Sequence, residues 1–336
     1  MKEKSIMSKY GEFMKDIFVR RLPCGVNNLP PRTLRRAFEG MPVDDSPERM
    51  ERLRKTLEKS QIGRETLKFL EEKGSAIGFE RMDYYGYFSP DENRVALNPA
   101  FSDEDLAITF VHEVRHARQD SIMSNTASTM TPETLLKNGF MIEADACAAE
   151  CVLAHQMLDL GDPSILIAHQ KTGYAPMSTA FEKEFAQSHD WDKARNAAFM
   201  EWYNLGVKPG YADSYISFMK EIGKRGDATD FSDSFAAKEM AQKLCINSDG
   251  KGYIGDPERL ESPEKLNVNA HQARSMASAA GRFMKRFKRS AEKLGLDKVF
   301  VEHDNGTYTT VRDTMNDMNA RAALRAASKG KGKGGR

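Results

Sequence analysis

Hydrophobic residues recur at helical spacing in two neighbouring segments of the chain. The first segment opens with Ser102, a helix-capping residue followed by three acids, and we expect a helix from there to about Gln119. The second begins near Thr131 and shows helical spacing over residues 140–158, with Asn138-Gly139 as a candidate interruption. The first helix would bury an apolar side made of Leu106, Phe110, Val111, Val114 and Ala117.

Two short runs of strand-favouring residues precede these helices. Residues 84–88 and 94–98 have this character, and the turn-forming residues 89–93 separate them. This pattern predicts a β-hairpin. Upstream, Ser46-Pro47 is typical of a helix start, and the charged stretch that follows to about Glu72 predicts an amphipathic helix or a helix pair.

The chain beyond Gly161 has a mostly helical pattern. A long basic helix is expected over about residues 266–294. Within it, Phe283 and Phe287 are four residues apart, which favours an amphipathic helix with both rings inward over a nucleic-acid-binding face. Residues 329–336 are rich in lysine and glycine and predict a disordered tail.

Charge and composition limit the kinds of partner that the protein is expected to bind. Charged residues make up 29% of the 336 residues, yet the formal net charge is only +1, so no global attraction to nucleic acid or to a membrane is expected. We find no signal peptide and no apolar run of membrane-spanning length, and we expect a cytoplasmic protein, with secretion as an effector left open. The chain has four cysteines, for which we expect buried thiols: Cys24, Cys147, Cys151 and Cys245.

The residues with the clearest chemistry are His112, Glu113 and His116, which form the pattern H-E-x-x-H inside the first predicted helix. Four residues advance a helix by about one turn, so both imidazoles project from one face and can hold a single Zn²⁺. Glu113, directly after the first histidine, can take a proton from a metal-activated water. The pattern therefore predicts a zinc-dependent hydrolase site.

A third ligand is expected from the second helix. Glu143 is our first choice, because alanines around it let this helix approach the first one closely. Glu150, two turns further along the same face, is the alternative third ligand. Asp145 points too far around the helix to be preferred and would instead face away and support the site.

The segments Leu97-Asn98, 110–116 and 143–150 resemble those of the ImmA/IrrE-type bacterial metallopeptidases. They are equally similar to uncharacterised families with the zinc-helix pattern H-E-x-x-H-x-x-Q, which Gln119 completes here. The resemblance implies that Glu143 is the third zinc ligand and that an edge strand ending at Leu97-Asn98 pairs with an extended substrate. Two positions depart from related patterns: Cys147 stands where thermolysin-like enzymes have aspartate, and Arg115 replaces a small residue.

Motif and resemblance together predict the fold class and the function. We expect an α+β fold with a zincin-like core, made of a small β-sheet and two zinc-binding helices, within a predominantly α-helical chain. The expected regions are 1–77 (helical), 78–160 (the core), 161–328 (helical) and the tail. The predicted activity is that of a zinc metallopeptidase that hydrolyses a peptide or protein substrate, with Glu113 as general base; the alternative is a catalytically idle, zincin-like regulatory or binding protein.

Two further features carry weaker signals. Residues 247–258 imitate a Ca²⁺-binding EF-hand loop, but lysine at a ligand position favours a glycine-rich turn. Zinc peptidases also use a Tyr or His to stabilise the developing oxyanion. The sequence does not choose among the candidates, which are Tyr203, Tyr211, Tyr215, His155 and His169.

Overall fold

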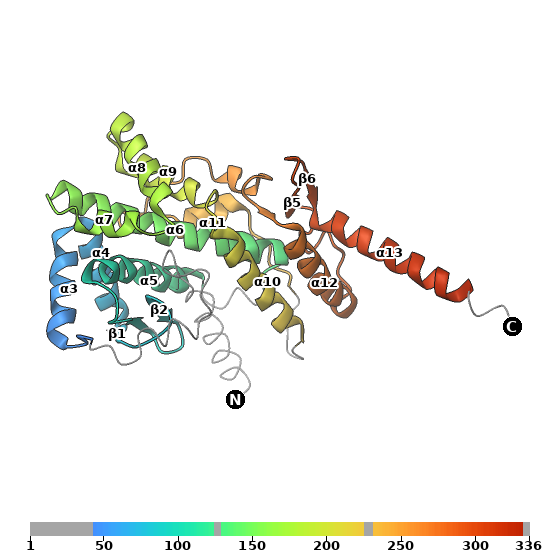
Figure 1. Cartoon of the computed structure of the whole chain (residues 1–336), viewed down its shortest axis with the longest axis horizontal. Helices are drawn as coiled ribbons and strands as arrows, with labels where there is room; N and C mark the ends of the chain where they lie inside the picture. Colours follow the sequence, from blue (N-terminus) through green and yellow to red (C-terminus); the bar gives the residue numbers. More distant parts are fainter. Residues whose placement is uncertain (1–42, 124–128, 225–230, 332–336) are drawn as a thin grey trace. The chain divides into compact units, whose positions relative to one another are not determined.

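The computed structural model describes residues 43–123, 129–224 and 231–331. Over these ranges the chain forms eleven α-helices and two three-stranded β-sheets (Figure 1). The predicted α+β class in a predominantly helical chain is confirmed. The N-terminal basic segment up to residue 42, which includes Cys24, and tail residues 332–336 lie outside the described residues.

The chain divides into two compact units. The first is built from the described residues of 1–124, 140–208 and 240–255, and the second from those of 125–139, 209–239 and 256–336. The chain therefore passes between the units several times. The four consecutive regions expected from the sequence stay a prediction.

The N-terminal helices of the first unit end where their capping residues stand. Helix α3 (Pro47–Lys59) starts after Ser46, whose side chain accepts a hydrogen bond from the Arg49 backbone. Helix α4 (Gln61–Lys73) begins after Ser60 in the same way and stops at Gly74, which has a left-handed backbone. The charged stretch predicted as a helix or helix pair is thus a pair.

The first sheet contains the predicted hairpin. Strands β2 (Gly86–Ser89) and β3 (Arg94–Leu97) are antiparallel, and β1 (Ala76–Phe79) pairs with β3 in parallel. The strand order β1-β3-β2 places β3 in the centre. The expectation that the strand ending at Leu97 is an edge strand is therefore wrong, because both of its sides are hydrogen-bonded within the sheet.

Helix α5 (Asp103–Met123) carries the H-E-x-x-H pattern and is buried on most sides. Ser102 accepts a hydrogen bond from the Asp105 backbone at its start, as predicted. The helix contacts β2, β3, α3, α4 and α7 (Ser164–Gln170). This surrounding explains why its residues 106–117 are all buried.

Helix α6 (Pro132–Asp159) is continuous, so the interruption expected at Asn138-Gly139 is absent. Glycine serves there for close approach: a Cβ on Gly139 would lie 2.1–2.6 Å from ring atoms of Tyr215. Helices α8 (Ala175–Ser188) and α9 (Trp191–Trp202) lie side by side further along the first unit (Figure 1).

The second unit holds a sheet that the sequence pattern did not predict. Strands β4 (Asn267–Val268), β5 (Phe300–Glu302) and β6 (Tyr308–Thr310) form it in the order β4-β5-β6. The expected helix over 266–294 is therefore shorter, because β4 occupies its start: helix α12 spans Ala270–Phe287. Its Phe283 is buried and stacks on Phe231, with ring centroids 4.3 Å apart.

The remaining helices complete the element order. They are α10 (Lys208–Lys224), α11 (Ala237–Leu244), the short 3₁₀ helix η1 (Pro257–Glu261) and α13 (Val311–Lys331). Among the helices of the described ranges, none combines the length and the apolar character needed to cross a bilayer.

The contact at Gly139 gives a test of the second unit. We expect Gly139→Ala to destabilise the protein by roughly 1–3 kcal/mol, since the added methyl group must displace a buried ring. Gly281→Ala is the control, because this helical glycine of α12 has no atom within 4 Å of the added Cβ. It should be neutral or stabilise by about 0.5–1 kcal/mol. Urea unfolding curves measure both changes; equal stability of the two variants would contradict the contact.

Candidate metal centre

The H-E-x-x-H residues lie in the interior of the first unit. His112, Glu113 and His116 are each at most 1% exposed. The helix period places both imidazoles on the side of α5 that faces α6. From α6, the side chain of Glu143 enters the same region and is 0% exposed.

Three potential donor groups face one another there. The Nε2 atoms of His112 and His116 are 2.9 Å apart. The carboxylate of Glu143 lies 3.8 Å from Nε2 of His112 through Oε2 and 3.7 Å from Nε2 of His116 through Oε1. The structure thus brings together the three residues that the sequence singled out as zinc ligands.

The chemistry and spacing of this set fit a metal ion. Ligand atoms that share one Zn²⁺ at about 2.0–2.2 Å can lie at most about 4 Å apart, and two imidazoles with one carboxylate are a common donor set for this metal. The spacing of 2.9–3.8 Å meets that condition. Burial, and then the neighbouring His112, hold the pKa of His116 well below its usual value, so the imidazole is neutral at pH 7, as metal binding requires.

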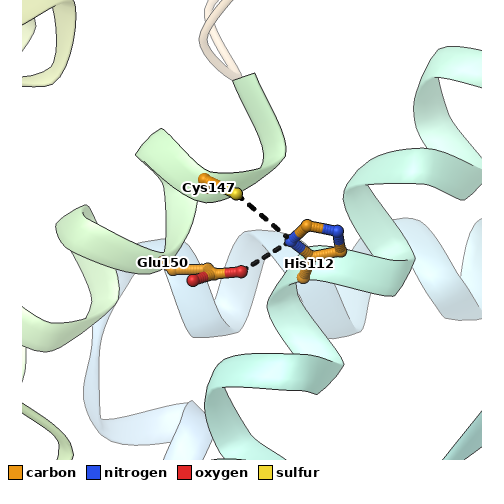
Figure 2. A group of neighbouring side chains, drawn as sticks. All are labelled: His112, Cys147 and Glu150. Atoms are coloured by element: carbon orange, nitrogen blue, oxygen red, sulfur yellow. Dashed lines mark hydrogen bonds and ion pairs between the residues drawn. The ribbon is translucent and has the colours of Figure 1, made fainter. Parts of the chain in front are cut away.

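The other ring nitrogen of His112 faces a second group of α6 side chains. Its Nδ1 lies 2.6 Å from Oε1 of Glu150 and 4.0 Å from Sγ of Cys147. Figure 2 shows both side chains meeting that one nitrogen while Nε2 points away from them. Histidine, cysteine and glutamate also form a candidate donor set, so His112 belongs to two such sets, one on each side of its ring.

His116 is held in a similar way through Gln119. Its Nδ1 lies 2.8 Å from Oε1 of Gln119. The amide nitrogen of Gln119 donates to the Ile142 carbonyl at 2.9 Å and to the Asp145 carboxylate at 2.7 Å. Because the amide nitrogen is the donor here, the amide oxygen accepts Nδ1–H of His116, which leaves Nε2 as the ring's acceptor.

Asp145 is the centre of a buried polar network. Its carboxylate accepts two hydrogen bonds from Arg115, at 2.5 and 2.9 Å, and one from Tyr253 at 2.6 Å. Arg195 adds a further contact at 3.3 Å. Burial alone would raise the pKa of Asp145, but the two guanidinium groups outweigh it and hold this pKa below its usual value.

This network explains why an arginine stands at position 115. The side chain of Arg115 is buried, and it also donates to the carbonyls of Leu244 and Ile246. It therefore joins α5 to α6 and to residues 244–246. Sequence reasoning missed Arg195 and Tyr253, which lie far from α5 along the chain.

The oxyanion candidates lie in different surroundings. Nε2 of His169 contacts Oε2 of Glu150 at 3.4 Å, and its Nδ1 lies 2.9 Å from the Ser178 hydroxyl. His155 stacks on Phe181. Tyr203 is buried, and this burial raises its pKa well above the usual value. Tyr211 and Tyr215 belong to the second unit. Of the candidates in the first unit, His169 is linked to the site through Glu150.

Two weaker predictions concern the cysteines and residues 247–258. Cys147, Cys151 and Cys245 are buried thiols, as expected. The segment that imitates an EF-hand forms a glycine-containing turn, in which the Asn247 backbone donates to the Lys251 carbonyl and Gly250 has a left-handed backbone. The amide oxygen of Asn247 accepts a hydrogen bond from Arg195 at 3.0 Å.

Comparison with known families identifies the family of the chain. Residues 35–254 match the model described as "Putative metallopeptidase family (DUF6782)". This match spans more than half of the chain, so the chain belongs to that family. No curated protein and no solved structure matches the chain. The family description suggests a peptidase and implies a metal, and the His/Glu set described above is a candidate site for it.

The Asp145 network gives a stability test. Asp145→Ala should destabilise the protein by about 3–5 kcal/mol, because it leaves the guanidinium groups of Arg115 and Arg195 buried without their carboxylate. Asp159→Ala is the matched control, since Asp159 is an exposed aspartate in the same helix. Its effect should stay within about 0.5 kcal/mol. Chemical denaturation of both variants measures the difference, and a small effect at Asp145 would contradict the role given to its carboxylate.

Proposed function

We propose that this protein is a zinc-dependent metallopeptidase. His112, His116 and Glu143 bind the metal through their Nε2 and carboxylate oxygen atoms. The convergence of these three buried groups, in a chain of a metallopeptidase family, is the observation that carries the proposal. Three protein ligands leave a coordination position for substrate or water, which a catalytic zinc site needs and a structural one lacks.

The substrate in this proposal is a peptide bond of a peptide or protein. A bound Zn²⁺ supplies Lewis-acid chemistry there, which polarises a carbonyl group and favours ionisation of water. Glu113 follows His112 directly in α5 and supplies the base: its carboxylate accepts a proton from water and then donates it to the departing amine. Glu113 is buried in the same turn of α5 as His112 and His116, and this placement supports the role.

Glu150 and Gln119 act as positioning residues in this scheme. Each accepts a hydrogen bond from Nδ1 of a histidine ligand, so both rings can present the Nε2 lone pair to the metal. Glu150, the alternative third ligand from the sequence, contacts His112 on the side of the ring opposite to Glu143. This arrangement favours Glu143 as the third metal ligand and Glu150 as the residue that orients the ring of His112.

Burial favours a second candidate function, in which the protein binds a metal without turning over substrate. Every residue of the proposed site is at most 1% exposed, although a peptide bond must reach the metal for hydrolysis. A catalytically idle, zincin-like binding protein would need no such access. The two functions differ in one result: protein with one zinc per chain that cleaves no member of a diverse peptide pool is the idle protein.

Metal content tests the ligand assignment. The wild-type protein should hold about one Zn²⁺ per chain, and His112→Ala, His116→Ala and Glu143→Gln should each lose it, because a three-ligand site rarely survives the loss of one ligand. His303→Ala, which removes an exposed histidine of the second unit, is the control and should keep full occupancy. Elemental analysis of the purified variants measures this.

Glu150 separates the two ligand assignments. Glu150→Gln retains a hydrogen-bond acceptor for His112, so this variant should still bind one Zn²⁺ but with roughly 10–100-fold lower affinity. Competition with a chelator measures that affinity. If Glu150→Gln loses zinc completely while Glu143→Gln keeps it, the third ligand is Glu150.

Hydrolysis tests the role of Glu113. Glu113→Gln keeps the size of the side chain but removes the base, so it should retain zinc and lose at least a hundredfold in rate. Glu104→Gln alters a glutamate in the first turn of the same helix and should leave the rate unchanged. Mass spectrometry of a peptide pool gives both rates; wild-type activity in Glu113→Gln would place the chemistry elsewhere.

A further inference from the structure

A pocket lies within the first unit, on a face of α5 different from the one that carries the histidines. Val111, Val114, Arg115 and Arg118 line it, and they recur at the spacing of one helix face. Arg195 from α9 and Ile62 from α4 complete its apolar and basic walls. Of the lining residues, Ser248 is exposed and Arg115 is buried.

Positive charge dominates this pocket. Three guanidinium groups line it, against the carboxylate of Glu65 at the wall and that of Asp145 behind Arg115. The Oε1 atom of Glu65 accepts hydrogen bonds from Ser248 and Gln61. Within the lining itself, the three guanidinium groups therefore outnumber the one carboxylate.

Arg118 carries that excess charge. It donates to the Asn247 carbonyl at 3.2 Å, and it forms no salt bridge with any residue of the described ranges. Its side chain is partly buried and lines the pocket together with Arg115 and Arg195. A partly desolvated guanidinium among two others is unfavourable unless an anion joins it. The Nε atom of Arg195, also buried, has no hydrogen-bond partner within the described part of the chain.

We propose that this pocket binds the carboxylate of a small organic anion that carries an apolar group. Guanidinium groups present planar forks of donors that match a carboxylate. Ile62, Val111 and Val114 supply apolar surface beside those donors. About 400 Å³ of space in the pocket, part of it open to solvent, is free of protein atoms. A small organic acid fits in this space.

The C-terminal residue of a short peptide has this chemistry, with one carboxylate and one side chain. The identification of the ligand as a peptide rests on the proposed peptidase function, whereas the binding of a carboxylate does not. No residue that lines the pocket is a proposed metal ligand. Arg115 lines the pocket and also donates to Asp145, so a variant of Arg115 would disturb the whole Asp145 network.

Arg118 is therefore the residue to change. Ligand-observed NMR titration with N-acetylalanine should show saturable binding, and its neutral amide, N-acetylalaninamide, should bind at least tenfold more weakly. Arg118→Gln should weaken binding of the acid at least tenfold and leave binding of the amide unchanged. Arg64→Gln is the matched control: Arg64 is an exposed arginine of α4 that does not line the pocket, and this variant should bind as the wild type does.

Three outcomes would overturn the proposal. They are equal binding of acid and amide, unchanged binding of the acid by a folded Arg118→Gln protein, and tighter binding of inorganic phosphate than of N-acetylalanine. Unfolding curves of Arg118→Gln identify a folding defect, and Arg118→Lys then serves instead, with charge retained but the fork lost and an intermediate affinity expected. None of these measurements uses hydrolysis, so their result is independent of the proposed peptidase activity.

Discussion

The buried carboxylate of Asp145 is the interaction on which the first unit depends. It joins Arg115 of α5, Arg195 of α9 and Tyr253, which come from three distant parts of the sequence. A charge buried this deeply is tolerated only when every partner is present. Through Gln119 the same carboxylate reaches His116, so the network that holds the helices together also orients one proposed metal ligand.

In the proposed site, the two nitrogen atoms of each imidazole ring have different roles. The Nδ1 side is engaged by Glu150 or Gln119, and the Nε2 side faces Glu143. Small residues make this possible: the alanines of α6 near Glu143 are buried and allow the carboxylate to reach α5. The same helix offers Cys147 on the opposite side of His112, so the choice of ring nitrogen decides which donor set a metal would meet.

Local periodicity explains what the sequence could predict. The i, i+4 spacing of His112 and His116 fixes their common face, and the hairpin follows from two strand-like runs around a turn. Contacts between distant segments could not be predicted in this way: the central position of β3 depends on β1, and the role of Gly139 depends on Tyr215. Strands β4–β6 have two or three residues each, too few to show an alternating pattern.

Zinc K-edge X-ray absorption of the purified wild-type protein tests the central claim most directly, because it reports which atoms surround the metal. The account predicts a first shell of nitrogen and oxygen only, at about 2.0–2.2 Å, with the scattering pattern of two imidazoles. A sulfur neighbour at about 2.3 Å would contradict it, because that distance would place the metal with Cys147 on the Nδ1 side of His112.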